Sequence, residues 1–517
     1  MVISFFKKNI DLVYMLIIVI FSFIFFYNFN AISPVNDEIV FENDLAIFYT
    51  AGIAMKRGLV LYKDLFDHKG PYVYFLFYIA SLISEVNHMG VYILFSIFFS
   101  ILFIIIYKII LLYTENKSIS FLTSISSLLY MFNDFTSYAN LSPENIIYLY
   151  IAMSVYLFLS ERKKYYAGET VNDYKNIFII GIFAGFILMS KYSLVLLLIP
   201  IIVIYMTDII KHKNIKKLIF MLLFGLLGVA VGLTPAMIYI FKNNILKDFI
   251  EAYIVFNTKY LGDKFILVKR YTGYTESLLE ILNSFKIVFL MSFVSIYIMY
   301  KKYKTTINII ITNKADKILN KENLIFYILC SLFSIICIMI TKRSYSYYTS
   351  ILVIGFIPLC YFILNKLSKL IKYKIVFSIC TICLLYFISY SFIGNRILRR
   401  SAEYKSIKDF KNFYVEAKNR IEKDDIKFLS ISIPNYYLVF NEIPASKYFI
   451  RPMIERTKFK DYYESIEEDV YNFKYDIFVL SYTGDFATYF SDEFYDFVRN
   501  NYEVVGTINY DKILIKK

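Results

Sequence analysis

Repeated apolar runs of membrane-spanning length constrain this chain more than any other feature. A helix of about 20 apolar residues crosses a hydrocarbon core that is about 30 Å thick. Hydrophobic residues make up 58% of the 517 residues, and the mean hydropathy is +0.55. We therefore predict a polytopic α-helical membrane protein with about eleven transmembrane helices. The predicted spans are Leu12–Phe29, Met89–Leu112, Ile119–Asp134, Asn145–Ser160, Asn176–Ser190, Ser193–Ile210, Leu218–Phe241, Phe285–Tyr300, Leu324–Thr341, Tyr347–Asn365 and Ile375–Gly394.

Two places in this pattern need a specific interpretation. The segment Ser190-Lys191-Tyr192 divides one overlong apolar run into two short helices. The apolar segment Tyr72–Val86 is too short to be a span, because a 15-residue helix covers only about 22 Å. Its many Tyr and Phe residues suit a membrane interface. We predict an in-plane, juxtamembrane helix there.

The distribution of basic residues predicts the orientation in the membrane. With the N-terminus in the cytoplasm, the inside loops hold 21 Lys and Arg in 71 residues, and the outside loops hold 13 in 116. Counting Tyr72–Val86 as a span would reverse this bias. We therefore expect a multi-pass plasma-membrane protein with a cytoplasmic N-terminus. The formal net charge of +14 resides largely in the inside loops, so nucleic acid is not an expected partner.

Two regions are expected. Residues 1–395 form the transmembrane region, and residues 396–517 form a small α/β domain outside the cytoplasm. Within the second region, the pattern predicts helices at Glu403–Glu422 and Phe486–Asn500 and strands at Lys427–Ile433 and Ile477–Ser481. A terminal hairpin is expected at Tyr502–Ile508 and Lys512–Ile515. The five cysteines lie inside apolar runs and are expected to be buried apolar residues, without disulfides or a metal.

The loop after the first span has the densest set of ionisable groups. The stretch Asn36–Ala80 combines a His-Lys pair, His68 and Lys69, with a Gly-Pro break at Gly70 and Pro71. Its acids are Asp37, Glu38, Glu42, Asp44, Asp64 and Asp67. We expect Asp64 and Asp67 to order the loop, for instance by pairing with Lys63 or Lys69.

The other polar groups that the topology places outside are Glu144, Lys191, the loop Lys242–Ser284 and Arg343 with its neighbouring tyrosines. Acids and bases that meet at one membrane boundary suit an anionic, phospholipid-like donor and an acceptor that must lose a proton. This combination favours an enzyme.

Three motifs resemble the GT-C superfamily of polytopic glycosyltransferases, which includes protein O-mannosyltransferases, lipid A aminoarabinose transferases and bacterial family-39-like enzymes. The first is Asp44-x-Ala-x-Phe48, followed by Gly58 and the run YKDLFDHKGPY at 62–72. It resembles the acidic first-loop motif and the juxtamembrane helix. The segment 140–144 (NLSPE) is similar to the second-loop acidic position. Arg343 with Tyr347 is similar to a late basic-aromatic motif, although the His that family members often carry there is missing.

The resemblance implies a GT-C-like fold and a hexosyl- or pentosyltransferase that uses a polyprenyl-phosphate-linked sugar, with inversion. Asp44 would be the general base, and Glu144 would orient the acceptor. The leaving phosphate would be bound by Lys69, Arg343, His68 or Lys191, with Tyr347 beside them. A divalent cation, Mg²⁺ or Mn²⁺, held by Asp44 and Glu144 could serve the same purpose. The acceptor, a glycan, a lipid or a protein, is not specified.

Each assignment has a structural alternative. Asp44 could cap a helix, and Asp37, Glu38 or Glu42 could be the base instead. Glu144 follows Ser142-Pro143 and could simply begin a helix, where an acid is favourable.

The basic residues and the overall function have alternatives as well. Lys69 could anchor the in-plane helix at lipid headgroups, and Lys191 could reach the interface as an isolated lysine. At the level of function, a transporter or flippase, or a polymerase or ligase of lipid-linked glycans, remains the alternative. Few charges lie inside the spans, and the acids gather in the first loop, which favours the transferase.

Overall fold

The structure is a computed structural model, and it is mostly helical. The residues it describes are 9–29, 32–34, 43–132, 141–211, 213–261, 314–340, 351, 396–421, 423, 425–432, 434–450, 456–481, 490–508 and 510–517. Three predicted spans, 285–300, 347–365 and 375–394, lie outside them, apart from Ile351. The chain divides into two compact units, which are described separately below. Unit 1 contains residues 1–30, 95–237 and 271–393, and unit 2 contains residues 31–94, 238–270 and 394–517.

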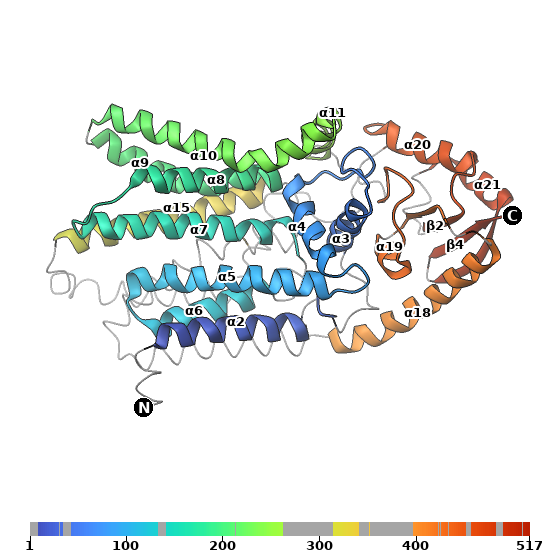
Figure 1. Cartoon of the computed structure of the whole chain (residues 1–517), viewed down its shortest axis with the longest axis horizontal. Helices are drawn as coiled ribbons and strands as arrows, with labels where there is room; N and C mark the ends of the chain where they lie inside the picture. Colours follow the sequence, from blue (N-terminus) through green and yellow to red (C-terminus); the bar gives the residue numbers. More distant parts are fainter. Residues whose placement is uncertain are drawn as a thin grey trace. The chain divides into compact units, whose positions relative to one another are not determined.

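Unit 1 is a bundle of long apolar helices, several of which run alongside one another (Figure 1). Its described helices are α2 (Ile10–Phe29), α6 (Lys117–Met131), α7 (Pro143–Tyr166), α8 (Asp173–Lys191), η2 (Tyr192–Leu198), α9 (Ile199–Lys211) and α15 (Lys314–Ile340), with most of α5 (Met89–Thr114) and α10 (Ile215–Lys242). The stretches Ile10–Tyr27, Met89–Leu112, Asp173–Lys211 and Ile215–Lys242 are long and apolar enough to cross a membrane. The chain is therefore a membrane protein, whereas the count of eleven spans stays a prediction.

Helices α8 and α10 pack at close range through glycines. Gly181 and Gly185 lie one turn apart on α8, and Gly228 and Gly232 lie one turn apart on α10. A Cβ atom added at Gly228 would lie 2.1 Å from the carbonyl oxygen of Phe178. Only glycine permits this approach, and such small-residue contacts drive helix association in lipid, where no hydrophobic effect is available.

The overlong apolar run is broken where the sequence predicts. Helix α8 ends at Lys191, whose backbone is extended with φ −150° and ψ 95° at the start of η2. The chain then continues as the separate helix α9. The break places Lys191 at a helix end and not in the middle of a span.

A buried ionic cluster joins three helices at the other end of the bundle. The guanidinium of Arg162 on α7 lies 2.5 Å from Asp208 on α9 and 2.5 Å from Glu322 on α15. The hydroxyl of Tyr166 donates to Glu322 at 2.6 Å. Because Arg162 presents a planar set of five donors, it satisfies both carboxylates at once.

Unit 2 combines short helices with one sheet. Its elements are α3 (Asn43–Lys56), α4 (Pro71–Ile83), α11 (Leu246–Phe249), η3 (Ile250–Val255), α12 (Phe256–Leu261), α18 (Arg396–Ile421), β1 (Phe428–Ile431), α19 (Asn435–Phe440), α20 (Lys460–Tyr471), β2 (Ile477–Ser481), α21 (Asp492–Asn501), β3 (Tyr502–Ile508) and β4 (Asp511–Lys516). Helix α4 occupies most of the segment predicted to lie in the membrane plane, and its orientation in a membrane stays a prediction.

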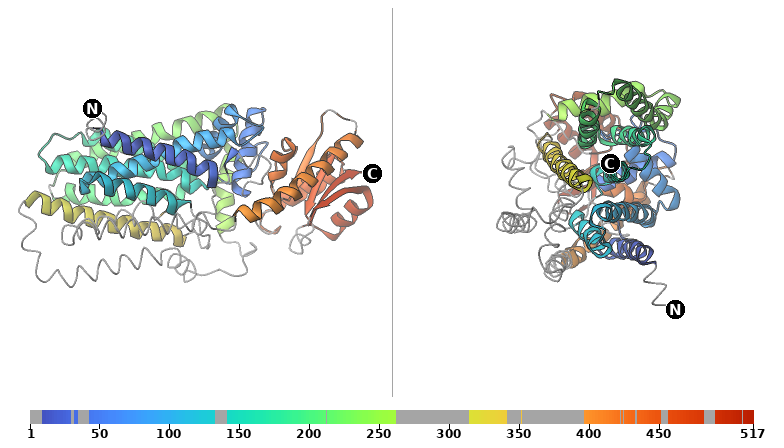
Figure 2. Two further views of the ribbon diagram at one scale, coloured as in Figure 1. Left: turned by 90° about the horizontal axis from the view of Figure 1, so that it is seen from below. Right: turned by 90° about the vertical axis from the view of Figure 1, so that its left-hand side faces the viewer.

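The sheet has the strand order β1-β2-β4-β3. Strands β1 and β2 are parallel, and β4 is antiparallel to both β2 and β3. Figure 2 shows α18 running along the sheet, and the buried residues Phe410, Tyr414 and Ala417 recur at helical spacing on it. The predicted strand Ile477–Ser481 is confirmed, as is the terminal hairpin. The boundary at 395/396 stays a prediction.

Aromatic packing joins the three sequence segments of unit 2. The ring of Phe66, from the opening loop, lies 5.1 Å from that of Phe256, 5.4 Å from that of Tyr448 and 5.0 Å from that of Phe459. The backbone N–H of Phe66 donates to the carbonyl of Lys447 at 2.8 Å. The C-terminal segment therefore supports the opening loop immediately before Asp67 and His68.

Candidate functional site

A tight turn holds the part of the opening loop that precedes the His-Lys pair. Gly58 and Tyr62 both have positive φ, +98° and +69°, and glycine adopts such values without strain. The carboxylate of Asp64 accepts the N–H of Val60 at 2.8 Å, and the N–H of Tyr62 donates to the carbonyl of Leu65 at 2.8 Å. Asp64 therefore orders the loop through the backbone, not through Lys63.

Helices α3 and α4 pack tightly on either side of this turn. Helix α4 begins at Pro71, where proline costs no hydrogen bond and has the helical φ already fixed. A Cβ atom added at Gly52 on α3 would lie 2.5 Å from the backbone of Phe77 on α4. The ring of Phe48 on α3 meets that of Tyr74 on α4 at 5.7 Å.

Asp67 is the centre of a buried polar array. Its side chain is 2% exposed, and the adjacent His68 is 4% exposed. Nδ1 of His68 lies 3.0 Å from Oδ1 of Asp67, and the hydroxyl of Tyr74 donates to Oδ2 at 2.5 Å. The side-chain amide of Asn257 donates to the carbonyl of His68 at 2.8 Å and fixes the backbone there.

The array ends at the ammonium of Lys69. Its Nζ donates to Nε2 of His68 at 2.6 Å, and its carbonyl accepts the hydroxyl of Tyr62 at 2.7 Å. The first contact makes Nε2 the acceptor, which leaves the proton of a neutral ring on Nδ1, beside Asp67. Among the described residues, His68 is the only side chain that bonds the ammonium, so two of its three N–H groups stay available for a ligand. We name Tyr74, Asp67, His68 and Lys69 the Asp67 array.

Electrostatics keep this array ionised. Burial alone would raise the pKa of Asp67, but the contacts with His68, Lys69 and Tyr74 outweigh it and hold the pKa well below its usual range. Burial and the charge of Asp67 raise the pKa of Tyr74 well above its usual value, so Tyr74 remains a donor. At neutral pH the array therefore contains a fixed carboxylate and a protonated tyrosine.

Asp44, the predicted base, lies in the first turn of α3 and is half-buried. It precedes Phe48 by four residues, so both side chains lie on the same side of the helix. Phe48 in turn contacts the ring of Tyr74, one member of the Asp67 array. The alternative bases Asp37, Glu38 and Glu42 lie outside the described residues.

Glu144 and Lys191 form an ion pair in unit 1. Glu144 is the second residue of α7, after the cap Ser142 and Pro143, and its side chain is 3% exposed. Lys191 is at the end of α8 with 19% exposure. The structure thus brings together an acid predicted for catalysis and a base predicted for phosphate, and their charges cancel.

Some predicted site residues are not tested by the structure. Arg343 and Tyr347 lie outside the described residues. Asp44 and Glu144 belong to different units, so their predicted sharing of a Mg²⁺ or Mn²⁺ ion is likewise untested. Among the described residues, no three His, Cys, Asp or Glu side chains gather as a metal site.

The central position of Asp67 in this array was not predicted from the sequence. Asp67 was expected to order the loop with Lys69 as a partner, whereas its direct contacts are to His68 and Tyr74. The adjacency of Asp67 and His68 was a usable signal. Nothing in the sequence indicates that Asn257, which is 189 positions away from His68, supports the same loop.

Comparison with known proteins adds a family. The profile of the dolichyl-phosphate-mannose-protein mannosyltransferase family matches residues 68–239. The match covers about a third of the chain and agrees with the resemblance to GT-C glycosyltransferases that the sequence motifs carry. The matched part begins at His68 and Lys69 and includes Glu144 and Lys191, and Asp44 and Arg343 lie outside it.

Two further comparisons complete this result. No protein with a curated description matches this chain in sequence. Among solved structures, it is similar to an archaeal oligosaccharyltransferase, AglB from Archaeoglobus fulgidus, in complex with an inhibitory peptide and a dolichol-phosphate. That similarity has 11% identity and a TM-score of 0.47, and covers 98% of this chain and 74% of the other.

Proposed function

We propose that this protein transfers a sugar from a polyprenyl-phosphate donor to an acceptor hydroxyl at the outer face of the plasma membrane, with inversion at the anomeric carbon. The Asp67 array is the observation that supports the proposal most directly. It presents the ammonium of Lys69, which His68 holds from one side and which keeps two N–H groups for a ligand. A half-buried carboxylate, Asp44, lies in the same unit. This combination supplies a cation for a leaving phosphate and a base for an acceptor.

Lys69 acts on the leaving group. As the bond between the anomeric carbon and the phosphate oxygen breaks, negative charge grows on that oxygen. A donor already aimed at this position lowers the barrier because it needs no reorganisation during the reaction. His68 holds Nζ from one side, and Asp67 and Tyr74 hold His68, so the ammonium is positioned before the donor binds.

Asp44 acts on the acceptor. Its carboxylate takes the proton from the acceptor hydroxyl while the oxygen attacks the anomeric carbon from the face opposite the phosphate. A bond from carbon to the acceptor oxygen forms, and the bond from carbon to the phosphate oxygen breaks with its electron pair. The proton ends on Asp44, the negative charge ends on the phosphate, and the configuration inverts.

The other parts of the chain have supporting roles in this proposal. The Glu144–Lys191 pair holds the start of α7 against the end of α8. The C-terminal segment stiffens the opening loop through the contacts of Phe66 with Tyr448 and Phe459.

The decisive experiment uses the purified full-length chain with a panel of polyprenyl-phosphate sugars, in the presence and absence of Mg²⁺ or Mn²⁺. We expect one donor to be consumed and Asp44→Asn to lower the rate by about 10²–10⁴-fold, as for a lost general base. The matched control is Asp461→Asn, because Asp461 is an exposed acid in the first turn of α20.

Two results would overturn the proposal. One is a complete lack of donor consumption across the panel by protein whose fold is intact. The other is an Asp44→Asn variant that is as active as Asp461→Asn. Retention of configuration in the product would reject single displacement and keep only the donor class.

A further inference from the structure

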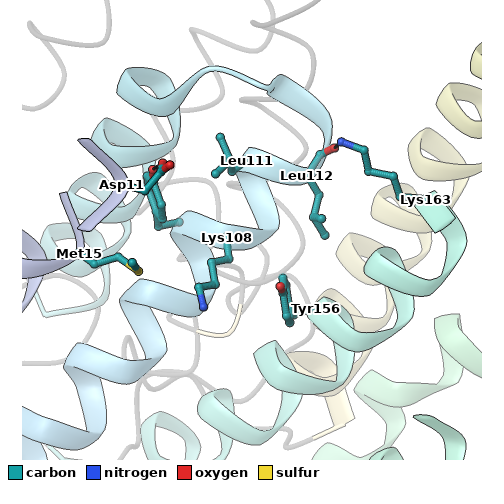
Figure 3. Close-up of a pocket in the computed structure, with 8 residues that line it drawn as sticks. Asp11, Met15, Lys108, Leu111, Leu112, Tyr156 and Lys163 are labelled. Atoms are coloured by element: carbon teal, nitrogen blue, oxygen red, sulfur yellow. Dashed lines mark hydrogen bonds between the residues drawn. The ribbon is translucent and has the colours of Figure 1, made fainter. Parts of the chain in front are cut away.

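A cavity of about 360 Å³ lies between α2, α5 and α7 in unit 1, apart from all the site residues above. Its lining residues are Asp11, Met15, Tyr107, Lys108, Leu111, Leu112, Tyr156 and Lys163 (Figure 3). One wall is apolar, and one aspartate, two lysines and two tyrosines provide the polar groups. All lie toward the helix ends that the loop charges assign to the cytoplasm.

Two of the charged groups in this cavity, Asp11 and Lys163, have partners within the protein. Asp11 is paired with Lys117 at 2.5 Å and accepts the hydroxyl of Tyr107 at 2.6 Å. Lys163 reaches from α7 to the carbonyl of Leu112 on α5 at 2.7 Å, as Figure 3 shows.

Lys108 and Tyr156 differ from these groups. Within the part of the chain that the structure describes, neither the ammonium of Lys108 nor the hydroxyl of Tyr156 has a hydrogen bond or an ion pair. The two residues come from facing helices, α5 and α7 (Figure 3). The cavity therefore presents a positive charge and a hydroxyl donor without a negative partner.

Apolar rows lead to this cavity along both outer helices. On α5, Ile97 and Ile101 are 47% and 39% exposed, and the row continues at helical spacing to Lys108. From Ile97 to Lys108 the helix rises about 16 Å, roughly half of a 30 Å hydrocarbon core. On α2, Leu12 and Leu16 are 62% and 59% exposed beside the lining residues. An acyl chain on either row would place its phosphate at the level of Lys108.

We propose that this cavity binds the phosphodiester headgroup of an anionic phospholipid from the leaflet at these helix ends. Basic pockets between transmembrane helices bind such headgroups. Lys108 supplies the charge, Tyr156 donates a hydrogen bond, and the wall of Met15, Leu111 and Leu112 receives the upper part of the chains. The proposal is independent of the sugar transfer proposed above.

The chain has no tryptophan, which gives a direct test. A Leu111→Trp variant of the full-length protein, reconstituted in mixed bilayers, carries its only tryptophan in the cavity wall. Brominated phosphatidylglycerol and brominated phosphatidylcholine are then compared as quenchers of its fluorescence. We expect a relative binding constant of about 3–10 in favour of phosphatidylglycerol.

Three further variants, each made in the Leu111→Trp background, test whether Lys108 causes the preference for phosphatidylglycerol. Lys108→Met keeps the apolar stem and removes the charge, so the ratio should fall to about 1. Lys108→Arg should keep the preference. Lys164→Met, at an exposed lysine of α7 that does not line the cavity, should leave it unchanged.

Three outcomes overturn the proposal. Equal quenching by the two lipids removes the anionic preference. A preference for phosphatidylglycerol that survives Lys108→Met shows that the lipid binds at another site. Full protection of the tryptophan by about 10 mM inorganic phosphate identifies a free-anion site and not a lipid site.

Discussion

Lys69 and Lys191 are both lysines near a buried carboxylate, and the two regions use this pairing in opposite ways. In unit 1, Lys191 touches Glu144 directly. In unit 2, the imidazole of His68 stands between Lys69 and Asp67, with contacts of 2.6 Å and 3.0 Å on its two sides. The ring roughly doubles the separation of the charges and so roughly halves their attraction.

The difference separates a structural task from a binding task. A lysine in contact with a carboxylate is neutralised and fixes two helix ends, here the start of α7 and the end of α8. A lysine held through an imidazole ring is positioned as well, but most of its positive electrostatic potential and two of its N–H donors remain available for a ligand. From the resemblance to GT-C enzymes both were expected to bind phosphate, and the geometry favours Lys69.

The largest effect on stability is expected at the direct pair. Lys191→Met leaves the carboxylate of Glu144, which is 3% exposed, without its lysine, and should lower the free energy of unfolding by about 3–5 kcal/mol. The double variant Glu144→Gln/Lys191→Met should recover most of this loss because no buried charge remains. Detergent-induced unfolding of the purified protein measures both. Equal losses in the single and double variants would show that the pair is not the cause.

Lys69 should behave in the opposite way. Lys69→Met should change the free energy of unfolding by less than about 1 kcal/mol but lower kcat by about 10²–10³-fold, the usual effect of losing a donor to developing charge. The assay is donor consumption at several donor concentrations. A raised KM with unchanged kcat would mean that Lys69 only holds a headgroup, and the contrast with Lys191 would then fail.

Asp67, which holds His68 and through it Lys69, predicts a pH-dependent effect on the free energy of unfolding. The pKa of Asp67 is held below its unfolded value, so its stabilisation is complete above about pH 4 and is lost as the pH falls through the folded pKa. Tyr74→Phe removes one contact that lowers this pKa, and should cost about 1–3 kcal/mol at pH 7. The deficit relative to the parent should stay constant until the pH approaches the folded pKa of Asp67, which lies well below its usual range, and should shrink there.

The control for this experiment is Tyr78→Phe on the same helix. In the described part of the chain, the hydroxyl of Tyr78 makes no hydrogen bond, so its removal should be nearly neutral. Unfolding curves of the three proteins from pH 7 down to about pH 1 give the comparison, because the deficit changes only near the folded pKa of Asp67. A Tyr74→Phe deficit that is constant with pH would place its origin in packing and not in the charge of Asp67.

Local features of this chain could be read from its sequence, and long-range pairings could not. The break at Lys191, the helix start at Pro71 and the strand Ile477–Ser481 follow from patterns within a few residues, and the structure has them. The opening loop was found by its density of ionisable groups.

The partners of that loop depend on tertiary packing. The hydroxyl of Tyr239 accepts the backbone N–H of Leu61 at 2.9 Å from 178 positions away, and Asn257 supports His68 from 189 positions away. Hydrophobic periodicity predicts which side of a helix is apolar. It does not predict which distant side chain will contact a given loop. For the same reason, the contact of Phe66 with the C-terminal segment was not predicted.

The smallest effect is expected at a third lysine–carboxylate pair, between Lys447 and Asp248 in unit 2. The pair is as direct as that of Lys191, at 2.7 Å, but its side chains are 30% and 31% exposed. Water screens such pairs, so Lys447→Met should cost less than about 1 kcal/mol, and the cost should vanish near 1 M salt, where the screening length is about 3 Å. The backbone carbonyl of Lys447 still accepts the N–H of Phe66 in this variant, so the loop keeps its attachment. A loss as large as that of Lys191→Met would mean that contact alone, and not burial, decides what a lysine pair contributes in this protein.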